Sequence, residues 1–155
     1  MTTSNWLSRT LVTSAVTSTA TTAALFLLSS RETGHPAAAL NATSHILWGD
    51  KAFAYDDWDV RHTLAGAALN VGAVALWSGV QSLLPKPRSV FAAARNASLV
   101  STLAYLTDYH LVPRRLTPGF EQRLSRQGLF GTYAVLAASL AMGALALSSP
   151  TKRLR

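Results

Sequence analysis

The sequence predicts an all-α protein, a membrane-embedded four-helix bundle that forms one domain over residues 1–155. The first reason is that residues 10–30, 63–84 and 128–149 contain no Asp, Glu, Lys or Arg. About 20 mostly apolar residues suffice for a helix to cross the hydrocarbon core, whereas a helix of a soluble bundle carries a charged face. The second reason is that prolines separate or follow these runs, as expected just outside helices. The average composition hides this pattern, because the mean hydropathy is only +0.21.

The first predicted span, residues 10–30, has a polar face. Its hydroxyl residues fall at helical spacing, which predicts that they face the bundle and bond to the backbone or to a neighbouring helix. A second interpretation is a cleaved signal peptide with Ala37 and Ala39 in the cleavage pattern, although the neutral run is long for such a peptide. The residues of the polar face are Thr10, Thr13, Ser14, Thr17, Ser18 and Thr21.

A short helix is expected between the first two spans. Pro36 would lie in its first turn, and Gly49 follows its end. This helix is too short to cross a membrane, so we expect it at the interface or dipping into it. Asn41, His45 and Trp48 fall on one stripe of the helix. The segment AYDDWDVRH then places aromatic side chains beside acids, as is typical of an interfacial belt.

The remaining spans are predicted at residues 63–84, 89–107 and 128–149. The span at 89–107 is the weakest because it contains Arg95, whose long stem lets the guanidinium reach the head groups. A three-span protein is therefore the alternative. Small residues at steps of three and four predict the faces through which these helices pack. The stripes are Ala65, Ala68, Gly72, Ala75 and Gly79; Ala94, Ala97, Ser101 and Ala104; and Ala134, Ala137, Ala141, Ala144 and Ser148.

A second short helix is expected between the third and fourth spans. Thr117 before Pro118 has the form of an N-cap followed by a first helical residue, and Glu121 would lie in the first turn. Phe120 and Leu124 give this helix an apolar side. We also expect the acidic segment DDWD of the first connection to meet the basic segments PRR and RLSR of the second.

Two of the small-residue stripes end on a charged residue. Four steps before Ala65 lies Arg61, and four steps after Ala104 lies Asp108. With four spans these two charges lie at the same level on the inner faces of their helices. A charge near the membrane edge is tolerated when it finds a partner, and an arginine fork against a carboxylate is a strong one. The sequence therefore predicts an Arg61–Asp108 ion pair.

Four spans also place residues 31–62 and 108–127 on one side of the membrane. These segments contain all seven acids and all four histidines, so any site is expected there. The opposite side carries only basic charge. Each side has seven Lys and Arg residues, so their number does not orient the protein; we take the purely basic side, with both termini, as cytoplasmic. The candidate site residues are Asn41, His45, Asp57, Arg61, His62, Asp108, His110 and Arg114.

Several chemistries are disfavoured by the sequence. His45, His62 and His110 are weak metal-ligand candidates, because they lack a diagnostic ligand spacing. No phosphate-binding loop, dinucleotide fingerprint or nucleophile elbow is present, so no cofactor and no catalytic residue is expected. The net charge of +7 comes without a basic stripe interleaved with aromatic residues, so we expect no nucleic-acid binding. The absence of cysteine rules out disulfides and thiol chemistry.

Two segments carry a resemblance. LNATSHILWGD and DYHLVPRRLTPGFEQRLS, taken together, resemble small bacterial inner-membrane proteins with four transmembrane helices and no assigned function. The resemblance covers about residues 36–149. It implies four spans and a location in the bacterial inner membrane, and it supplies no activity, cofactor or catalytic residue.

The sequence leaves three functional hypotheses. The first is a non-enzymatic partner or assembly subunit that presents one polar, aromatic-rimmed face and contacts the lipid bilayer, another membrane protein or a second copy of itself. The second is a small membrane enzyme or metal-binding protein that uses the histidines and acids of that face. The third is a small-solute transporter subunit that works through the hydroxyl face of the first span.

Overall fold

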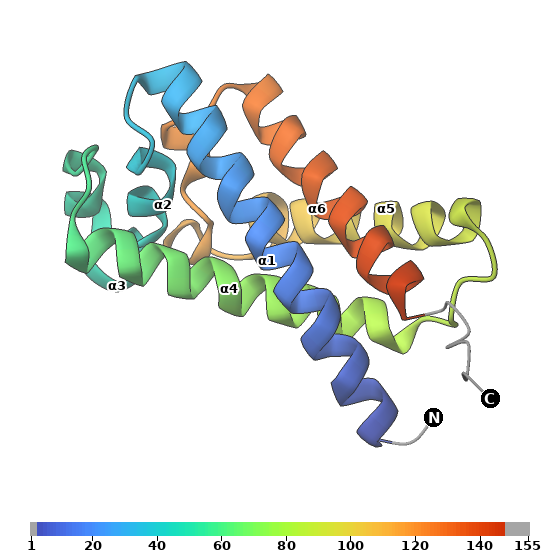
Figure 1. Ribbon diagram of the computed structural model, residues 1–155. Helices are drawn as coiled ribbons and strands as arrows, with labels where there is room; N and C mark the ends of the chain where they lie inside the picture. Colours follow the sequence, from blue (N-terminus) through green and yellow to red (C-terminus); the bar gives the residue numbers. More distant parts are fainter. Residues whose placement is uncertain (1–2, 148–155) are drawn as a thin grey trace.

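The structure is a computed structural model that describes residues 3–147, a part of the chain that is helical without any strand. Four long helices form its body (Figure 1): α1 (Thr3–Thr33), α4 (Val60–Leu83), α5 (Val90–Leu106) and α6 (Arg126–Ala146). Short elements connect α1 to α4, namely α2 (Ala38–Thr43), α3 (His45–Trp48) and the 3-10 helix η1 (Gly49–Ala54). The π-helical turn η2 (Thr107–Leu111) and the 3-10 turns η3 (Arg114–Leu116) and η4 (Phe120–Gln122) connect α5 to α6.

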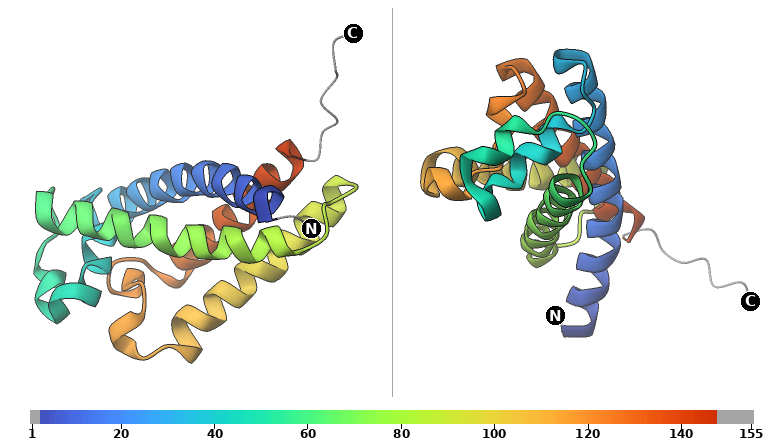
Figure 2. Two further views of the ribbon diagram at one scale, coloured as in Figure 1. Left: turned by 90° about the horizontal axis from the view of Figure 1, so that it is seen from below. Right: turned by 90° about the vertical axis from the view of Figure 1, so that its left-hand side faces the viewer.

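The long helices pack in the spatial order α4, α1, α6, α5. Helix α1 has its main contacts with α4 and α6, and α5 packs chiefly on α6 (Figure 1). The two connections that contain the short elements gather at one end of the bundle, as Figure 2 shows from two further directions. We call residues 34–59 and 107–125 the cap. The loop between α4 and α5 lies at the opposite end, beside the start of α1 and the end of α6.

Three of the four long helices are long and apolar enough to cross a membrane: Asn5–Thr33 within α1, Val60–Leu83 and Arg126–Ala146. They correspond to the spans predicted at 10–30, 63–84 and 128–149, although residues 148–149 lie outside the described part. Helix α5 has 17 residues and is not among the three. The four-span arrangement is therefore not confirmed. Helix α5 does continue without interruption into η2, so the helical stretch reaches from Val90 to Leu111.

The predicted polar face of the first helix is confirmed by burial for three of its six residues, whereas the hydroxyls of Thr10, Thr17 and Ser18 have no hydrogen-bond partner among the described residues. Thr13, Thr17 and Thr21 are buried, on a line with Leu25 and Ser29 in steps of four residues. Thr21 donates to the carbonyl oxygen of Thr17, so its hydroxyl is satisfied within the helix. These small side chains allow both α4 and α6 to lie close against α1.

The predicted packing stripes of α4 and α6 are largely wrong, and among their described residues only Gly79 and Ala144 are buried. On α4 the buried line is His62, Gly66, Asn70, Val74 and Ser78, whereas Ala68 and Gly72 are exposed. On α6 the stripe is displaced in the same way: Leu136 and Leu140 are buried and Ala134 is exposed. On α5 the prediction holds for Ala97, Ser101 and Ala104 but not for Ala94, which is exposed. Ser148 lies outside the described residues.

Helix α2, which lies where the sequence predicts a short helix between the first two spans, is a core element of the bundle. Every residue of α2 is buried, and the helix packs against α4. Gly66 makes this packing possible, because a Cβ atom there would collide with the carbonyl oxygen of Leu40. The closest backbone approach in the cap therefore depends on a residue without a side chain.

The second short helix is also different from the prediction. Thr117 does not cap a helix: its hydroxyl donates backward to the carbonyl oxygen of Arg114 at 3.0 Å. Gly119 follows with φ +78°, a left-handed conformation that turns the chain, and η4 then makes a single 3-10 turn. The predicted apolar side is confirmed, since Phe120 and Leu124 are buried against Leu25 and Leu40.

Substitution at Gly66 tests the contact between α2 and α4. Gly66→Ala should lower the free energy of unfolding in detergent by about 2 kcal/mol or more, because the backbone of α2 must move away from α4. Gly72→Ala is the matched control on the same helix. A Cβ atom at Gly72 meets nothing within 4 Å, so alanine there should be neutral or stabilise by about 0.5–1 kcal/mol. Thermal unfolding of both variants measures the difference, and equal effects would contradict the contact.

Candidate functional site

Asn41 lies at the centre of the cap and is completely buried. Its side-chain amide donates to the carbonyl oxygens of Tyr55 at 2.9 Å and Asp57 at 2.7 Å. Its carbonyl oxygen accepts a hydrogen bond of 2.7 Å from the Thr63 hydroxyl. The hydrogen-bonding capacity of Asn41 is thus used to hold the segment before α4 against α2, which is a structural role.

His45 joins the two connections of the cap. Its Nδ1 lies 2.9 Å from the carbonyl oxygen of Ala42 and its Nε2 lies 3.2 Å from that of Arg114. The ring stacks on Phe53 with 5.0 Å between centroids. Because both ring nitrogens face carbonyl oxygens, neither is directed at a metal position. The side chain of Arg114, another candidate, is exposed; the backbone of this residue makes the contact.

His62 is held by the N-cap of its own helix. Asp59 precedes α4 and its Oδ1 accepts from the backbone N–H of His62 at 2.7 Å and lies 2.5 Å from Nδ1. The backbone hydrogen bond from His62 has the largest effect on the Asp59 carboxylate, and the side-chain hydrogen bond from His62 comes next. Both hold the pKa of Asp59 below its usual value. The His62 ring stacks on Tyr55 at 3.8 Å and meets the edge of Trp48 at 5.1 Å. A carboxylate that orients a histidine is also found in catalytic sites, but this ring is packed between aromatic rings and is only 5% exposed.

The predicted Arg61–Asp108 ion pair is not formed. The Arg61 guanidinium lies over the Trp48 ring, with its central carbon 4.4 Å from the ring centroid, in a cation–π contact. Asp108 instead accepts a hydrogen bond of 2.6 Å from the Tyr133 hydroxyl on α6. The reason is the order of the helices: α5, which leads into Asp108, packs mainly on α6 and has few contacts with α4.

An aromatic cluster surrounds Asp108. The rings of Tyr105 and Tyr133 are 5.3 Å apart, and Tyr109 and His110 pack against the same Tyr105 ring. Burial raises the pKa of Asp108, and the hydrogen bond from Tyr133 opposes this shift. Burial also raises the pKa of Tyr109, whose hydroxyl has no hydrogen-bond partner within residues 3–147. His110 itself is exposed.

The expected contact between the acidic and basic segments of the two connections is confirmed by one pair. The Arg123 guanidinium lies 2.7 Å from the Asp56 carboxylate and also donates to the carbonyl oxygen of Phe53. Arg115 donates to the carbonyl oxygens of Ile46 and Leu47. Asp57, another candidate, forms a largely exposed pair with His35 at 2.8 Å. These contacts make the two connections one unit.

The eight candidate residues do not converge on one centre. Asn41 and His45 are packed in the first connection and His62 lies beside them at the start of α4, whereas Asp108 and His110 belong to the aromatic cluster at the end of α5. In the part of the chain that the structure describes, no three His, Asp or Glu side chains come together as metal ligands. His45, His62 and His110 contact different partners.

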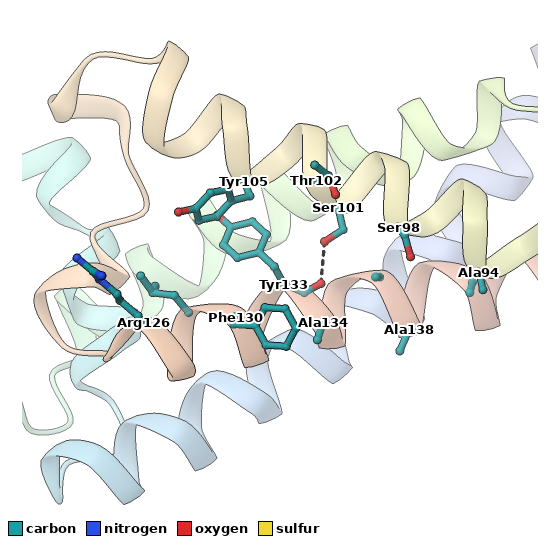
Figure 3. Close-up of a pocket in the computed structure, with 13 residues that line it drawn as sticks. Ala94, Ser98, Ser101, Thr102, Tyr105, Arg126, Phe130, Tyr133, Ala134 and Ala138 are labelled. Carbon is teal, nitrogen blue, oxygen red and sulfur yellow. Dashed lines mark hydrogen bonds between the residues drawn. The ribbon is translucent and has the colours of Figure 1, made fainter.

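Tyr133 borders two concave features of the molecule. A groove of about 750 Å³ runs between α5 and α6 and opens outward (Figure 3). Arg126 and Tyr105 lie at its cap end and Ala94 at its other end. A smaller cavity of about 120 Å³ lies between α1, α2, α4, α6 and the second connection, with Asp108 in its wall, and it is partly open beside Ala73 and Leu116. Tyr133 lines both the groove and the cavity. No spacing rule in the sequence identifies this residue as a candidate.

Comparison of the chain with models of protein families, with curated proteins and with solved structures finds no match.

Replacement of Asp108 by Asn shows whether this carboxylate is paired with a cation, because the two cases predict opposite changes in thermal stability. An ion pair with Arg61 would make Asp108→Asn destabilising, whereas a half-buried carboxylate with a raised pKa is itself unfavourable when ionised. Between the ordinary pKa of an aspartate and the raised pKa of Asp108, the folded state binds more protons than the unfolded state. The free energy of unfolding therefore falls as the pH rises through this interval. Asp108→Asn should therefore unfold at a higher temperature than the native protein at pH 8.

The stabilisation by Asp108→Asn should shrink as the pH is lowered towards the ordinary pKa of aspartate, where the native carboxyl is protonated in both states. Thermal unfolding in detergent between pH 4 and 8 measures it. Asp50→Asn changes an exposed acid and is the control. A loss of stability for Asp108→Asn at pH 8 would contradict the assignment.

Proposed function

We propose that this protein is a non-enzymatic assembly subunit of a membrane complex, and that its groove between α5 and α6 binds a transmembrane helix of another membrane protein. The observation that carries the proposal is the groove itself, which the chain's own residues leave open on the outer side of the bundle. The polar, aromatic-rimmed cap is the rigid end of this scaffold, since its hydrogen-bonding groups are used internally.

The proposal includes four spans. Helix α5 has 17 residues, the lower limit for a helix that crosses the hydrocarbon core, and η2 continues it into the cap. Large apolar side chains on α5 are exposed, among them Phe91 and Leu103, as expected for a surface in lipid. Arg95 is exposed near the start of α5, where its side chain can reach the head groups. The end of the bundle with Lys86 and Arg88 faces the cytoplasm of a bacterial inner membrane in this proposal.

The chemistry of the groove favours a helix over an acyl chain. Small side chains along both walls, such as Ala94, Ala134 and Ala138, allow a third helix backbone to approach closely. Ser98 and Thr102 line the groove, and within the described residues neither hydroxyl has a hydrogen-bond partner. Hydroxyls that face hydrocarbon are unfavourable without a partner, and a polar group on an incoming helix supplies one whereas a lipid tail does not.

The groove also favours a different protein over a second copy of this chain. In a two-fold symmetric dimer the same surface meets itself, so two grooves would face each other and leave a void between them. A single helix fills the groove from one side. Arg126 at the cap end of the groove is exposed and favours an acidic residue at the corresponding end of the partner helix.

Single cysteines test the number of spans, because the native chain has none. Lys51→Cys, Lys86→Cys and Arg114→Cys place one thiol in the first connection, in the loop between α4 and α5, and in the second connection. With four spans, a membrane-impermeant maleimide added to spheroplasts labels the variants at 51 and 114, and the variant at 86 reacts only after permeabilisation. If α5 does not cross the membrane, the variant at 114 behaves like the variant at 86.

Site-specific photo-cross-linking tests the groove. A photoreactive phenylalanine analogue in place of Ala138 should give one discrete protein adduct in cells, and the same analogue in place of Leu76 should not. Leu76 is 63% exposed on α4, away from the groove, and is the matched control. Ala94→Phe narrows the groove from the opposite wall and should abolish the adduct, whereas Ala68→Phe on α4 should leave it unchanged. An adduct of twice the chain mass, or a lipid adduct alone, would overturn the proposal.

A further inference from the structure

The cavity inside the bundle has one charged group in its wall. It has a volume of about 120 Å³, several times what a single water molecule needs, and it is bounded by α1, α2, α4, α6 and the second connection. Asp108 is the only Asp, Glu, Lys, Arg or His among the lining residues. The Tyr133 hydroxyl donates to one of its carboxylate oxygens, Oδ2.

Asp108 has no cationic partner within residues 3–147. The ion pairs of that part of the chain involve other acids, namely Asp56, Asp57 and Asp59. Arg61, the cation that the sequence would supply, is held on the Trp48 ring. The other carboxylate oxygen, Oδ1, accepts no hydrogen bond from any described residue. A negative charge therefore lies at the cavity with half of its hydrogen-bonding capacity unused.

The neutral polar groups of the wall are also acceptors. The hydroxyl hydrogens of Thr21 and Thr132 are donated to backbone carbonyl oxygens of their own helices, so their lone pairs remain available. Asn70 donates one hydrogen of its NH₂ group to the Thr22 hydroxyl at 3.3 Å, and its carbonyl oxygen accepts no hydrogen bond from any described residue. A wall made of a carboxylate and neutral acceptors is complementary to a ligand that is positively charged and donates hydrogen bonds.

The other lining residues of the cavity favour an organic ammonium ion over a metal ion. A divalent metal ion prefers six or more oxygen ligands and usually more than one carboxylate, and this cavity has a single carboxylate. Most of the other lining residues are apolar, such as Leu69, Val74 and Leu136, and Trp77 and Phe120 add aromatic rings. Apolar and aromatic walls around one carboxylate suit an organic ammonium ion, whose charged end pairs with the acid while its alkyl part is buried.

We propose that this cavity is a binding site for a small protonated amine, with the ammonium group on the Asp108 carboxylate and a short alkyl chain between Val74, Leu136 and Phe120. The ammonium hydrogens bond to Oδ1 of Asp108 and to the acceptor groups of the wall. Tyr133 positions the carboxylate through its hydroxyl group. This site is separate from the groove of the proposed assembly function, so either can fail without the other.

Binding of propylammonium to the purified full-length protein in detergent tests the proposal. Isothermal titration and thermal unfolding at pH 8 should show saturable binding and a raised unfolding temperature with propylammonium chloride. Propan-1-ol has a similar shape and no charge, and sodium and potassium chloride at the same ionic strength provide the charge alone. Each of these should bind at least tenfold more weakly. Equal effects of the alcohol or of the inorganic cations would overturn the proposal.

Two variants separate the roles of charge and space. Asp108→Asn keeps an acceptor for the Tyr133 hydroxyl and should reduce propylammonium affinity at least tenfold, whereas Asp50→Asn should leave it unchanged. Ala73→Leu narrows the cavity from α4 and leaves the carboxylate in place, so it should weaken propylammonium more than methylammonium. The proposal of an amine site would be overturned if a folded Asp108→Asn protein bound propylammonium with unchanged affinity. It would also be overturned if Ala73→Leu lowered the affinities for propylammonium and methylammonium equally.

Discussion

The close contact between α2 and α4, with the Asn41 amide buried beside it, is the constraint on which the cap depends. Gly66 lets the Leu40 carbonyl oxygen approach the backbone of α4. This approach brings Asn41 within reach of Thr63, and the same amide fixes the carbonyl oxygens of Tyr55 and Asp57. The segment held in this way ends at Asp59, which caps α4. Loss of these hydrogen bonds is costly, because it leaves polar groups of the buried Asn41 side chain unsatisfied.

This arrangement of the cap determines the position of Arg61. Once residues 55–59 are fixed, α4 begins where Arg61 can lie over Trp48, and the guanidinium remains near water. Asp108 instead accepts a hydrogen bond from the Tyr133 hydroxyl on α6. A hydrogen bond from a neutral hydroxyl offsets only part of the desolvation of a carboxylate, which is why burial dominates and the pKa of Asp108 is raised. The cation–π contact thus follows from the cap, whereas the unpaired acid follows from the packing of α5 on α6.

The parts of the structure that the sequence predicts are those set by composition along one helix. Uncharged runs locate the long helices, and the hydroxyl face of α1 follows from its spacing. The packing face of α6 is largely missed because alanine suits two surfaces equally: a contact between neighbouring helices and the wall of an open groove. Ala134 and Ala137 line the groove, and the buried line of α6 lies on the adjacent face. On α4 the buried face is the one that carries Gly66, where the backbone of α2 approaches. The Arg61–Asp108 pair fails because the order of helices in space is not encoded in any single helix.

Tyr133 connects the two concave features by three separate interactions. Its hydroxyl holds Asp108 at the cavity, its backbone carbonyl oxygen accepts from Ser101 at 2.7 Å, and its ring lines the groove (Figure 3). The Ser101 bond ties α5 to α6 at this point, so a change in the separation of the two helices alters the groove and the position of the Asp108 partner together. A ligand shifts a conformational equilibrium only if it binds one of the two conformations more tightly than the other. A helix bound in the groove therefore influences the cavity only if it favours one position of Tyr133 over another. A helix that enters between α5 and α6 contacts this ring directly, and a small ligand beside Asp108 contacts its hydroxyl group.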